Sequence, residues 1–146
     1  MSDKSTVLSR GEREEFLSEP HVAALSVASG DEGRAPLTLP IWYQYEPGGE
    51  LWVMTATASR KAELLTRAGR FSLMVDRLLP TVRYVSVEGP IVSAEPATPE
   101  QLEELTRRYL PPEEVAAYVE TAAATFGDQT VFRMKPQRWL ATDLGA

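Results

Sequence analysis

The segment Met54-Thr55-Ala56-Thr57-Ala58-Ser59-Arg60-Lys61-Ala62 lies at the centre of the stretch from Leu37 to Gly89, around which the rest of the chain is organised. The apolar run that ends at Thr55 is typical of a β-strand, and Ser59 is a favourable N-cap for a helix. Gly69 stands where a left-handed residue would end that helix. The segment therefore predicts a strand, a short turn and a helix that begins at Ser59.

Two cations occupy the first turn of this predicted helix. Arg60 and Lys61 oppose the positive end of the helix dipole, at a place where several backbone N–H groups have no partner within the helix. A phosphate bound there would accept hydrogen bonds from these N–H groups and from the hydroxyl of Ser59 or Thr57, and would pair with both cations. The alternative is that both side chains point into water. Residue chemistry alone leaves these two interpretations open.

The composition limits the possible chemistry. The chain has 146 residues, which fit one domain over residues 1–146, and it contains no cysteine and a single histidine, His21. Thiolate catalysis, disulfides and Cys/His zinc sites are therefore excluded, and we predict no metal site. His21 follows Pro20 at a junction between elements, where we expect a structural role. Any redox or group-transfer chemistry would come from a cofactor.

The charge and the hydropathy of the sequence limit the possible binding partners and the cellular location of the protein. The net charge is −6 and the basic residues are dispersed, which argues against a nucleic-acid partner. The N-terminal residues Met1 to Ser5 lack the apolar core of a signal peptide, and no apolar run approaches the length that spans a membrane. We therefore expect a cytoplasmic protein without a membrane partner.

Strand patterns dominate the chain. They lie at residues 22–29, 37–45, 51–55, 71–76, 84–92 and 130–142, the last of which is interrupted by Pro136. Apolar residues alternate most regularly from Leu37 to Tyr45, but Pro40 cannot donate to a neighbouring strand. Its position is therefore an edge, a bulge or a place where a ligand lies alongside. Gly89 marks a bend or a close approach of another backbone segment.

Helix signals lie between and after the strands. Ser9 with Glu12, and Thr98 with Gln101, form capping boxes, and Pro112 starts a further helix that Gly127 ends. We expect the last two helices to be packing elements. Six strands, one short inserted helix and a helical pair near the C-terminus predict a β-rich α+β fold, an antiparallel six-stranded split β-barrel.

The part from Leu37 to Val92 resembles the pyridoxamine 5′-phosphate oxidase-like family of flavin-binding split barrels. Thr55 is followed four positions later by Ser59-Arg60-Lys61-Ala62, and the later strand reads Arg83-Tyr84-Val85-x-Val87-x-Gly89. The order and the separation of both motifs agree with the family, although together they cover less than half of the chain.

The resemblance implies a homodimer that holds a flavin-type cofactor, FMN, at the subunit interface. By this resemblance, the cofactor phosphate would be bound by Thr55, Ser59, Arg60 and Lys61. The isoalloxazine ring would lie against Pro40, Ile41 and Trp42, and the backbone around Met54 would contact the polar edge of the ring. Tyr84 would contact the flavin from the other subunit. Trp139, with Arg138, would close the site from the C-terminal end.

The sequence also departs from the oxidase. Leu39 and Gln44 stand where the oxidase has an arginine and a lysine, so we do not expect the chain to oxidise pyridoxamine phosphate. It is more similar to the branch that uses FMN or the deazaflavin coenzyme (F-420 type) to reduce small organic molecules. This implies hydride transfer between the cofactor and a small substrate, with Tyr43, Tyr84 and Arg83 all open as groups that stabilise negative charge or donate a proton.

Two further hypotheses stand beside the cofactor-dependent reductase. The chain could bind or sense a flavin without turnover, or it could be a β-barrel scaffold or interaction protein in which Arg60 and Lys61 are merely solvated. Loss of cofactor affinity on removal of these two cations separates the last hypothesis from the others.

Overall fold

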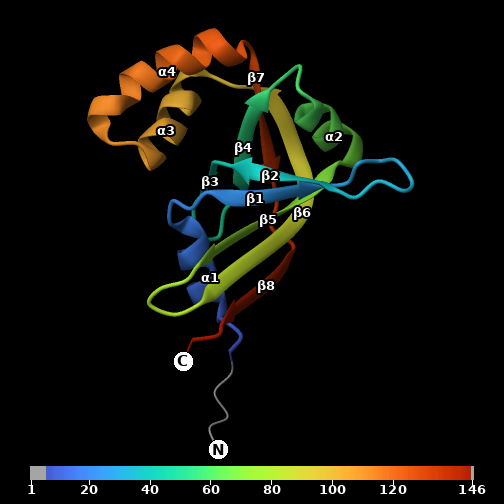
Figure 1. Ribbon diagram of the computed structural model, residues 1–146, viewed down its shortest axis with the longest axis vertical. Coiled ribbons are helices and arrows are strands. Elements are labelled where there is room, and N and C mark those ends of the chain that lie inside the picture. Colours follow the sequence, from blue (N-terminus) through green and yellow to red (C-terminus); the bar gives the residue numbers. More distant parts are fainter. Residues whose placement is uncertain (1–5, 146) are drawn as a thin grey trace, which may run out of the picture.

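The computed structural model describes residues 6–145, so the residues used above to argue against a signal peptide, Met1 to Ser5, lie outside it (Figure 1). Within the described part the helices are α1 (Arg10–Ser18), α2 (Arg60–Ala68), α3 (Pro99–Tyr109) and α4 (Pro112–Phe126). The strands are β1 (Ala23–Val27), β2 (Leu37–Ile41), β3 (Tyr43–Tyr45), β4 (Leu51–Ala56), β5 (Arg70–Arg77), β6 (Arg83–Pro96), β7 (Gln129–Met134) and β8 (Arg138–Asp143).

All strands belong to one antiparallel sheet that curls into a split barrel. Its order is β2-β1-β5-β6-β7-β4-β3, and β8 pairs with the first half of β6. The two ends of this path, β2 and β3, are separated in sequence by Trp42 alone, so the chain itself closes the curl there. The long strand β6 changes partners from β5 and β8 to β7, with a register shift between Ile91 and Ser93.

The β-rich split-barrel class is confirmed, but the predicted number of six strands is wrong, because the described residues form eight. Two predicted strands each divide. Residues 37–45 split at Trp42, where the chain leaves its pairing with β1 and begins to pair with β4. Residues 130–142 split around Pro136, where the chain leaves β7 and returns as β8. At Trp42 the alternating pattern continues through the change of partner and hides the break, whereas the interruption at Pro136 was visible in the sequence.

The predicted strand and helix signals are otherwise borne out. Pro40 lies on β2, which pairs only with β1 among the described strands and is therefore an edge strand. Ser9, Ser59 and Thr98 all cap their helices. Gly89 is a close-approach position, because a Cβ there would overlap the backbone carbonyl of Lys135.

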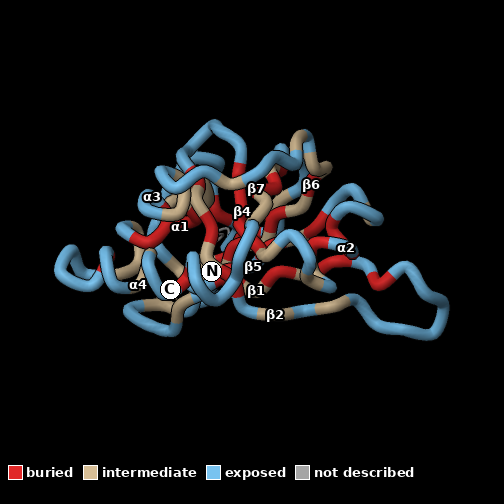
Figure 2. Tube along the Cα trace, turned by 90° about the horizontal axis from the view of Figure 1, so that it is seen from above, coloured by how far each residue is buried: buried red, intermediate tan, exposed pale blue. Residues whose placement is uncertain are grey.

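The core fills the inside of the barrel. Figure 2 shows the buried residues gathered along the strands at the centre of the molecule, with the exposed residues on the helices and loops around them. A second, smaller cluster lies under α3 and consists of Trp52, Met54, Leu105 and Val131. It is this cluster that joins the helical pair to the sheet.

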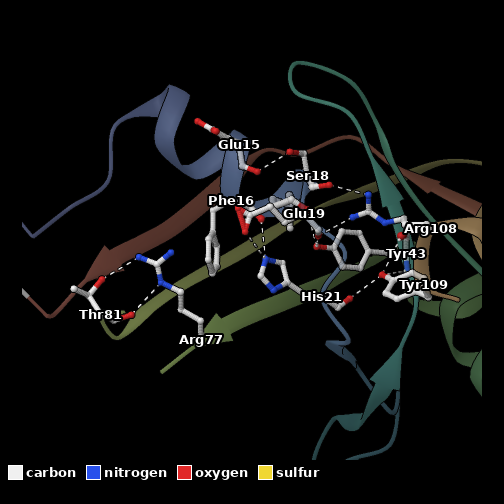
Figure 3. Close-up of polar contacts among 11 residues, drawn as sticks. Glu15, Phe16, Ser18, Glu19, His21, Tyr43, Arg77, Thr81, Arg108 and Tyr109 are labelled. Carbon is white, nitrogen blue, oxygen red and sulfur yellow. Dashed lines mark hydrogen bonds and ion pairs between the residues drawn. The ribbon is translucent and has the colours of Figure 1, made fainter. Parts of the chain in front are cut away.

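A network of hydrogen bonds at the C-terminal end of α1 fixes the position of α3 (Figure 3). The Arg108 guanidinium on α3 donates to the carbonyls of Ser18 and Glu19, each at 2.8 Å. The Tyr43 hydroxyl donates to the Leu17 carbonyl at 2.6 Å, and burial raises the pKa of Tyr43. The imidazole of His21 lies 2.9 Å from the Phe16 carbonyl, in keeping with a structural role.

Candidate functional site

A cavity of about 490 Å³ lies between the sheet, the start of α2 and the helical pair. Strands β2 and β4 and the residues beside them provide one wall, and α3 and α4 provide the opposite wall. The lining residues are Val22, Pro40, Ile41, Trp42, Met54, Thr55 and Ala56 from the sheet side, Ser59 and Lys61 from α2 and its cap, Leu102, Leu105, Thr106, Tyr118, Ala122 and Phe126 from the helical pair, and Gln129 from β7.

The turn between β4 and α2 brings the helix N-terminus to this cavity. The Thr57 N–H donates to the Asp128 carbonyl at 2.9 Å, which ties the turn to the start of β7. The Ser59 hydroxyl donates to the Ala56 carbonyl at 2.7 Å and accepts from the Ala62 N–H at 3.1 Å. Among residues 6–145, no group accepts a hydrogen bond from the N–H of Arg60 or Lys61. Two donors of the first turn are therefore available to a ligand.

The two cations of the first turn have different surroundings. Arg60 does not line the cavity: its guanidinium lies 3.3 Å from Glu63 and 3.9 Å from Asp31. Lys61 does line the cavity, is half-buried and has no ion pair with any residue that the structure describes. Burial lowers the pKa of Lys61. It is also the one charged side chain on the described wall, so the cavity carries a single uncompensated positive charge.

Trp42 connects the sheet to both helices of the pair. Its ring is stacked on Tyr109 of α3, with the centroids 4.6 Å apart and the planes at 10°, and Tyr118 of α4 lies 5.2 Å away. The Tyr109 hydroxyl in turn accepts from the Tyr43 N–H at 3.2 Å. The aromatic part of the wall is therefore held in place by contacts on both sides of the cavity.

Seven of the ten residues predicted to bind the cofactor meet at this cavity, namely Pro40, Ile41, Trp42, Met54, Thr55, Ser59 and Lys61. The other three do not line it. Arg60 points to the surface, Tyr84 lies on β6 opposite Asp76 and Thr142, and Trp139 lies on β8 opposite Val87. The resemblance implies that Tyr84 contacts the flavin bound by the partner subunit.

The helical pair contributes wall residues that were expected only to pack. Tyr118, Ala122 and Phe126 recur every four residues on α4 and face the cavity together with Leu102 and Leu105 of α3. Such a stripe has the same sequence pattern as a packing face, because both are apolar at helical spacing. Phe126 is 47% exposed, so this stripe is only partly covered.

None of the three candidate proton donors lines the cavity. Tyr43 is buried and hydrogen-bonded to backbone carbonyls, and Arg83 is held by Asp143 at 2.9 Å. The part of the chain that the structure describes contains no cluster of His, Cys, Asp and Glu that would hold a metal ion. Its helices are too short or too polar to cross a bilayer.

Comparisons with known proteins agree with this architecture. The chain matches the family model described as pyridoxamine 5′-phosphate oxidase over residues 9–143. Among curated proteins, none matches the chain significantly.

Solved structures provide a second comparison. A conserved hypothetical protein from Mycobacterium tuberculosis aligns with a TM-score of 0.68 and 25% identity, over 98% of this chain and 90% of that chain. An F420 reductase aligns with a TM-score of 0.65 and 19% identity, over 87% and 94%. An FAD-binding protein from Mesorhizobium loti aligns with a TM-score of 0.62 and 18% identity, over 95% and 97%. With the family model matching nearly the whole chain, the protein belongs to the pyridoxamine 5′-phosphate oxidase family of flavin-binding split barrels.

Proposed function

We propose that this protein binds a flavin-type cofactor, FMN or the deazaflavin coenzyme, in the cavity between β4, α2 and the helical pair, and reduces a small organic molecule there. The observation that carries the proposal is the state of Lys61: a half-buried ammonium group without a counter-ion among residues 6–145, next to two unused backbone donors. A half-buried cation without an ion pair can still pair with an anion, and a bound phosphate would supply that anion.

The residues present fit such a cofactor. Lys61 and the N–H groups of the first turn of α2 suit a phosphate, and the wall formed by Trp42, Met54 and the α4 stripe suits a flat, largely apolar ring system. A bound flavin or deazaflavin would supply the hydride, a chemistry that protein side chains lack. The chain itself would hold the phosphate, orient the substrate against the aromatic wall and exclude water.

We also propose that two copies of the chain associate. A row of outward-facing residues crosses the sheet in register, from Pro40 through Ala24, Met74 and Ser86 to Leu140. Met74 and Leu140 are 37% and 62% exposed, which leaves apolar area that a second copy would cover. Sedimentation of the purified protein at the mass of a dimer is the expected result. Such an assembly would work in the cytoplasm, where reduced cofactors are available.

The decisive experiment separates Lys61 from Arg60. The purified protein is titrated with FMN and, separately, with the deazaflavin coenzyme, and the quenching of tryptophan fluorescence is followed because Trp42 lines the cavity. Lys61→Ala should weaken binding of the native cofactor about tenfold or more, which is at least about 1.4 kcal/mol. Arg60→Ala removes an equal charge from the same helical turn, outside the cavity, and should have a much smaller effect.

Two results would contradict this proposal. Absence of saturable binding for both cofactors would rule out the flavin site, and equal losses for Lys61→Ala and Arg60→Ala would reduce the effect to general surface charge. If the cofactor binds but its reduced form is not reoxidised by any artificial acceptor, the protein stores or senses the cofactor instead of using it in turnover.

A further inference from the structure

A second cavity lies at the end of the barrel covered by α1. It measures about 440 Å³ and is enclosed by α1, the turn between β3 and β4, and the connection between β7 and β8. It shares no lining residue with the first cavity. Trp139, which was expected to close the cofactor site, lies here instead. The two cavities can therefore be considered, and tested, separately.

Arg13 is the unusual residue of this cavity. Its guanidinium lies over the ring of Trp139, with Cζ 4.6 Å from the ring centroid. The guanidinium makes no hydrogen bond or ion pair with any residue from 6 to 145, and its Nε is buried without a partner. Buried guanidinium donors are normally satisfied, because an unmet donor next to a charge costs free energy. Arg13 is thus held in position by an aromatic ring, with its donors unused.

The neighbouring arginine shows the ordinary arrangement. Arg10, one turn earlier on α1, donates to Glu14 at 2.9 Å and is 80% exposed. This pair also occupies Glu14, one of the two carboxylates of the cavity. The other carboxylate, Glu50, forms no ion pair with a described residue. Neither carboxylate therefore neutralises Arg13.

The rest of the cavity adds a second cation and aromatic surface. Lys135 lines it from the connection before β8 and has no ion pair within the described chain. The ring of Tyr45 lies edge-on to Trp139, with the centroids 6.3 Å apart. Gly48 and Gly49 form the opposite rim and have no side chains that would fill the space. The cavity therefore holds two unpaired cations and one unpaired carboxylate, Glu50, beside Trp139, in a protein with a net charge of −6.

We propose that this cavity binds a small planar aromatic anion, one that carries a carboxylate or phosphate group. Arg13, with Lys135, would meet the charged group, because a guanidinium offers paired donors that match two oxygens of a carboxylate or phosphate. The flat body of the ligand would lie against the accessible part of Trp139, whose ring is backed edge-on by the buried Tyr45. This site is independent of the cofactor cavity and does not depend on the function proposed above.

Phenyl phosphate is a suitable probe, with inorganic phosphate and phenol as its two halves. Binding is followed by ¹H–¹⁵N spectra of the full chain, in which the Trp139 and Trp42 indole signals are assigned from Trp139→Phe and Trp42→Phe, and the Trp42 signal reports on the other cavity. We expect phenyl phosphate to move the Trp139 signal saturably, and each half alone to bind at least about tenfold more weakly. Such a result would support a single site that recognises both the charged group and the aromatic ring of the ligand.

Variants test which residues are responsible. Arg13→Gln and Lys135→Gln should each weaken phenyl phosphate binding severalfold, whereas Arg107→Gln, which removes an exposed, paired arginine of α3, should not change it. Lys135 is exposed, so its variant remains informative even if Arg13→Gln disturbs folding. An unmoved Trp139 signal, inorganic phosphate binding as tightly as phenyl phosphate, or equal losses in all three variants would each overturn the proposal. Movement of the Trp42 signal alone would place the ligand in the first cavity and overturn it as well.

Discussion

The C-terminal end of α1 and the N-terminal end of α2 differ in how their unpaired backbone groups are satisfied. Each helix has nine residues and leaves backbone groups unpaired at its ends. At α1, the carbonyls of Leu17, Ser18 and Glu19 accept hydrogen bonds from side chains of distant elements. At α2, two N–H groups have no acceptor in the described chain, and the same first turn carries two cationic side chains.

This difference indicates that the α1 end contributes to the stability of the fold, whereas the α2 end is suited to bind a ligand. Side chains that belong to the protein complete the α1 end, so its contribution should appear in stability. The α2 end is incomplete, and its charges disfavour the helix by a few tenths of a kcal/mol in the absence of an anion. Its contribution should appear in binding. Substitutions at the two ends should therefore have opposite signatures.

The largest effect is expected for Arg108→Gln at the α1 end. The substitution removes two hydrogen bonds from a charged donor, one to the part-buried Ser18 carbonyl and one to the exposed Glu19 carbonyl, and we expect the free energy of unfolding to fall by about 2 kcal/mol. Denaturant unfolding followed by circular dichroism measures this change. Arg107→Gln is the matched control, since its exposed pair with Glu103 should contribute less than about 0.5 kcal/mol. Equal losses in the two variants would contradict a special role for the α1 network.

The next largest effect concerns Lys61 at the α2 end and should appear only when the cofactor is present. Without cofactor, Lys61→Ala should leave the free energy of unfolding unchanged within about 0.5 kcal/mol. With saturating cofactor, the stabilisation by the ligand should be smaller in the variant by about 1.4 kcal/mol, as a tenfold weaker affinity requires. Thermal unfolding with and without cofactor measures both values. A loss of stability in the cofactor-free variant would mean that Lys61 serves the fold.

The sequence predicted the α2 end better than the α1 end, for a physical reason. The Ser59 cap, the two cations and Gly69 lie within one short segment, so local rules place them. Arg108 meets Ser18 across ninety positions of sequence, and no local pattern specifies such a contact. The same limit applies within the α2 end: the ion pair of Arg60 with Asp31 depends on a loop that folds back, so the sequence did not separate Arg60 from Lys61.

The split of residues 37–45 at Trp42 was hidden in a similar way. The alternating pattern from Leu37 to Tyr45 predicted a strand correctly, but a change of strand partner at Trp42 leaves that pattern intact. The helical pair was predicted as helices, whereas its place on the cavity wall depends on the contact of Trp42 with Tyr109 and Tyr118. Local periodicity therefore predicts the helices and strands, whereas the position of the site depends on contacts between elements that are distant in sequence.

Acid should weaken the part of the fold beside α1. The Gly145 N–H and the Thr81 hydroxyl, followed by Arg83, lower the pKa of Asp143 from 3.8 to about 2. Because the folded-state pKa is lower, the stabilisation is complete above pH 3.8 and is lost as the pH falls through about 2. Asp143→Asn should therefore be less stable than the original chain at neutral pH, and the difference should disappear in strong acid. A difference that persists unchanged at low pH would assign the effect to packing.

The smallest effect is expected for the hydroxyl of Ser59, where the two roles meet in one residue. Its proton is directed to the Ala56 carbonyl, its oxygen accepts from the Ala62 N–H, and the Thr55 hydroxyl lies 3.3 Å from it, so the fold already engages this hydroxyl. Ser59→Ala should lower the free energy of unfolding by about 1 kcal/mol, whereas glycine, a tolerated N-cap, should cost only a few tenths. Because the hydroxyl is occupied, Ser59→Gly should change cofactor affinity less than about twofold, well below the loss in Lys61→Ala. A tenfold loss in the glycine variant would instead show that the hydroxyl leaves Ala56 to bind the ligand, and the cap would then belong to the binding site as well as to the helix.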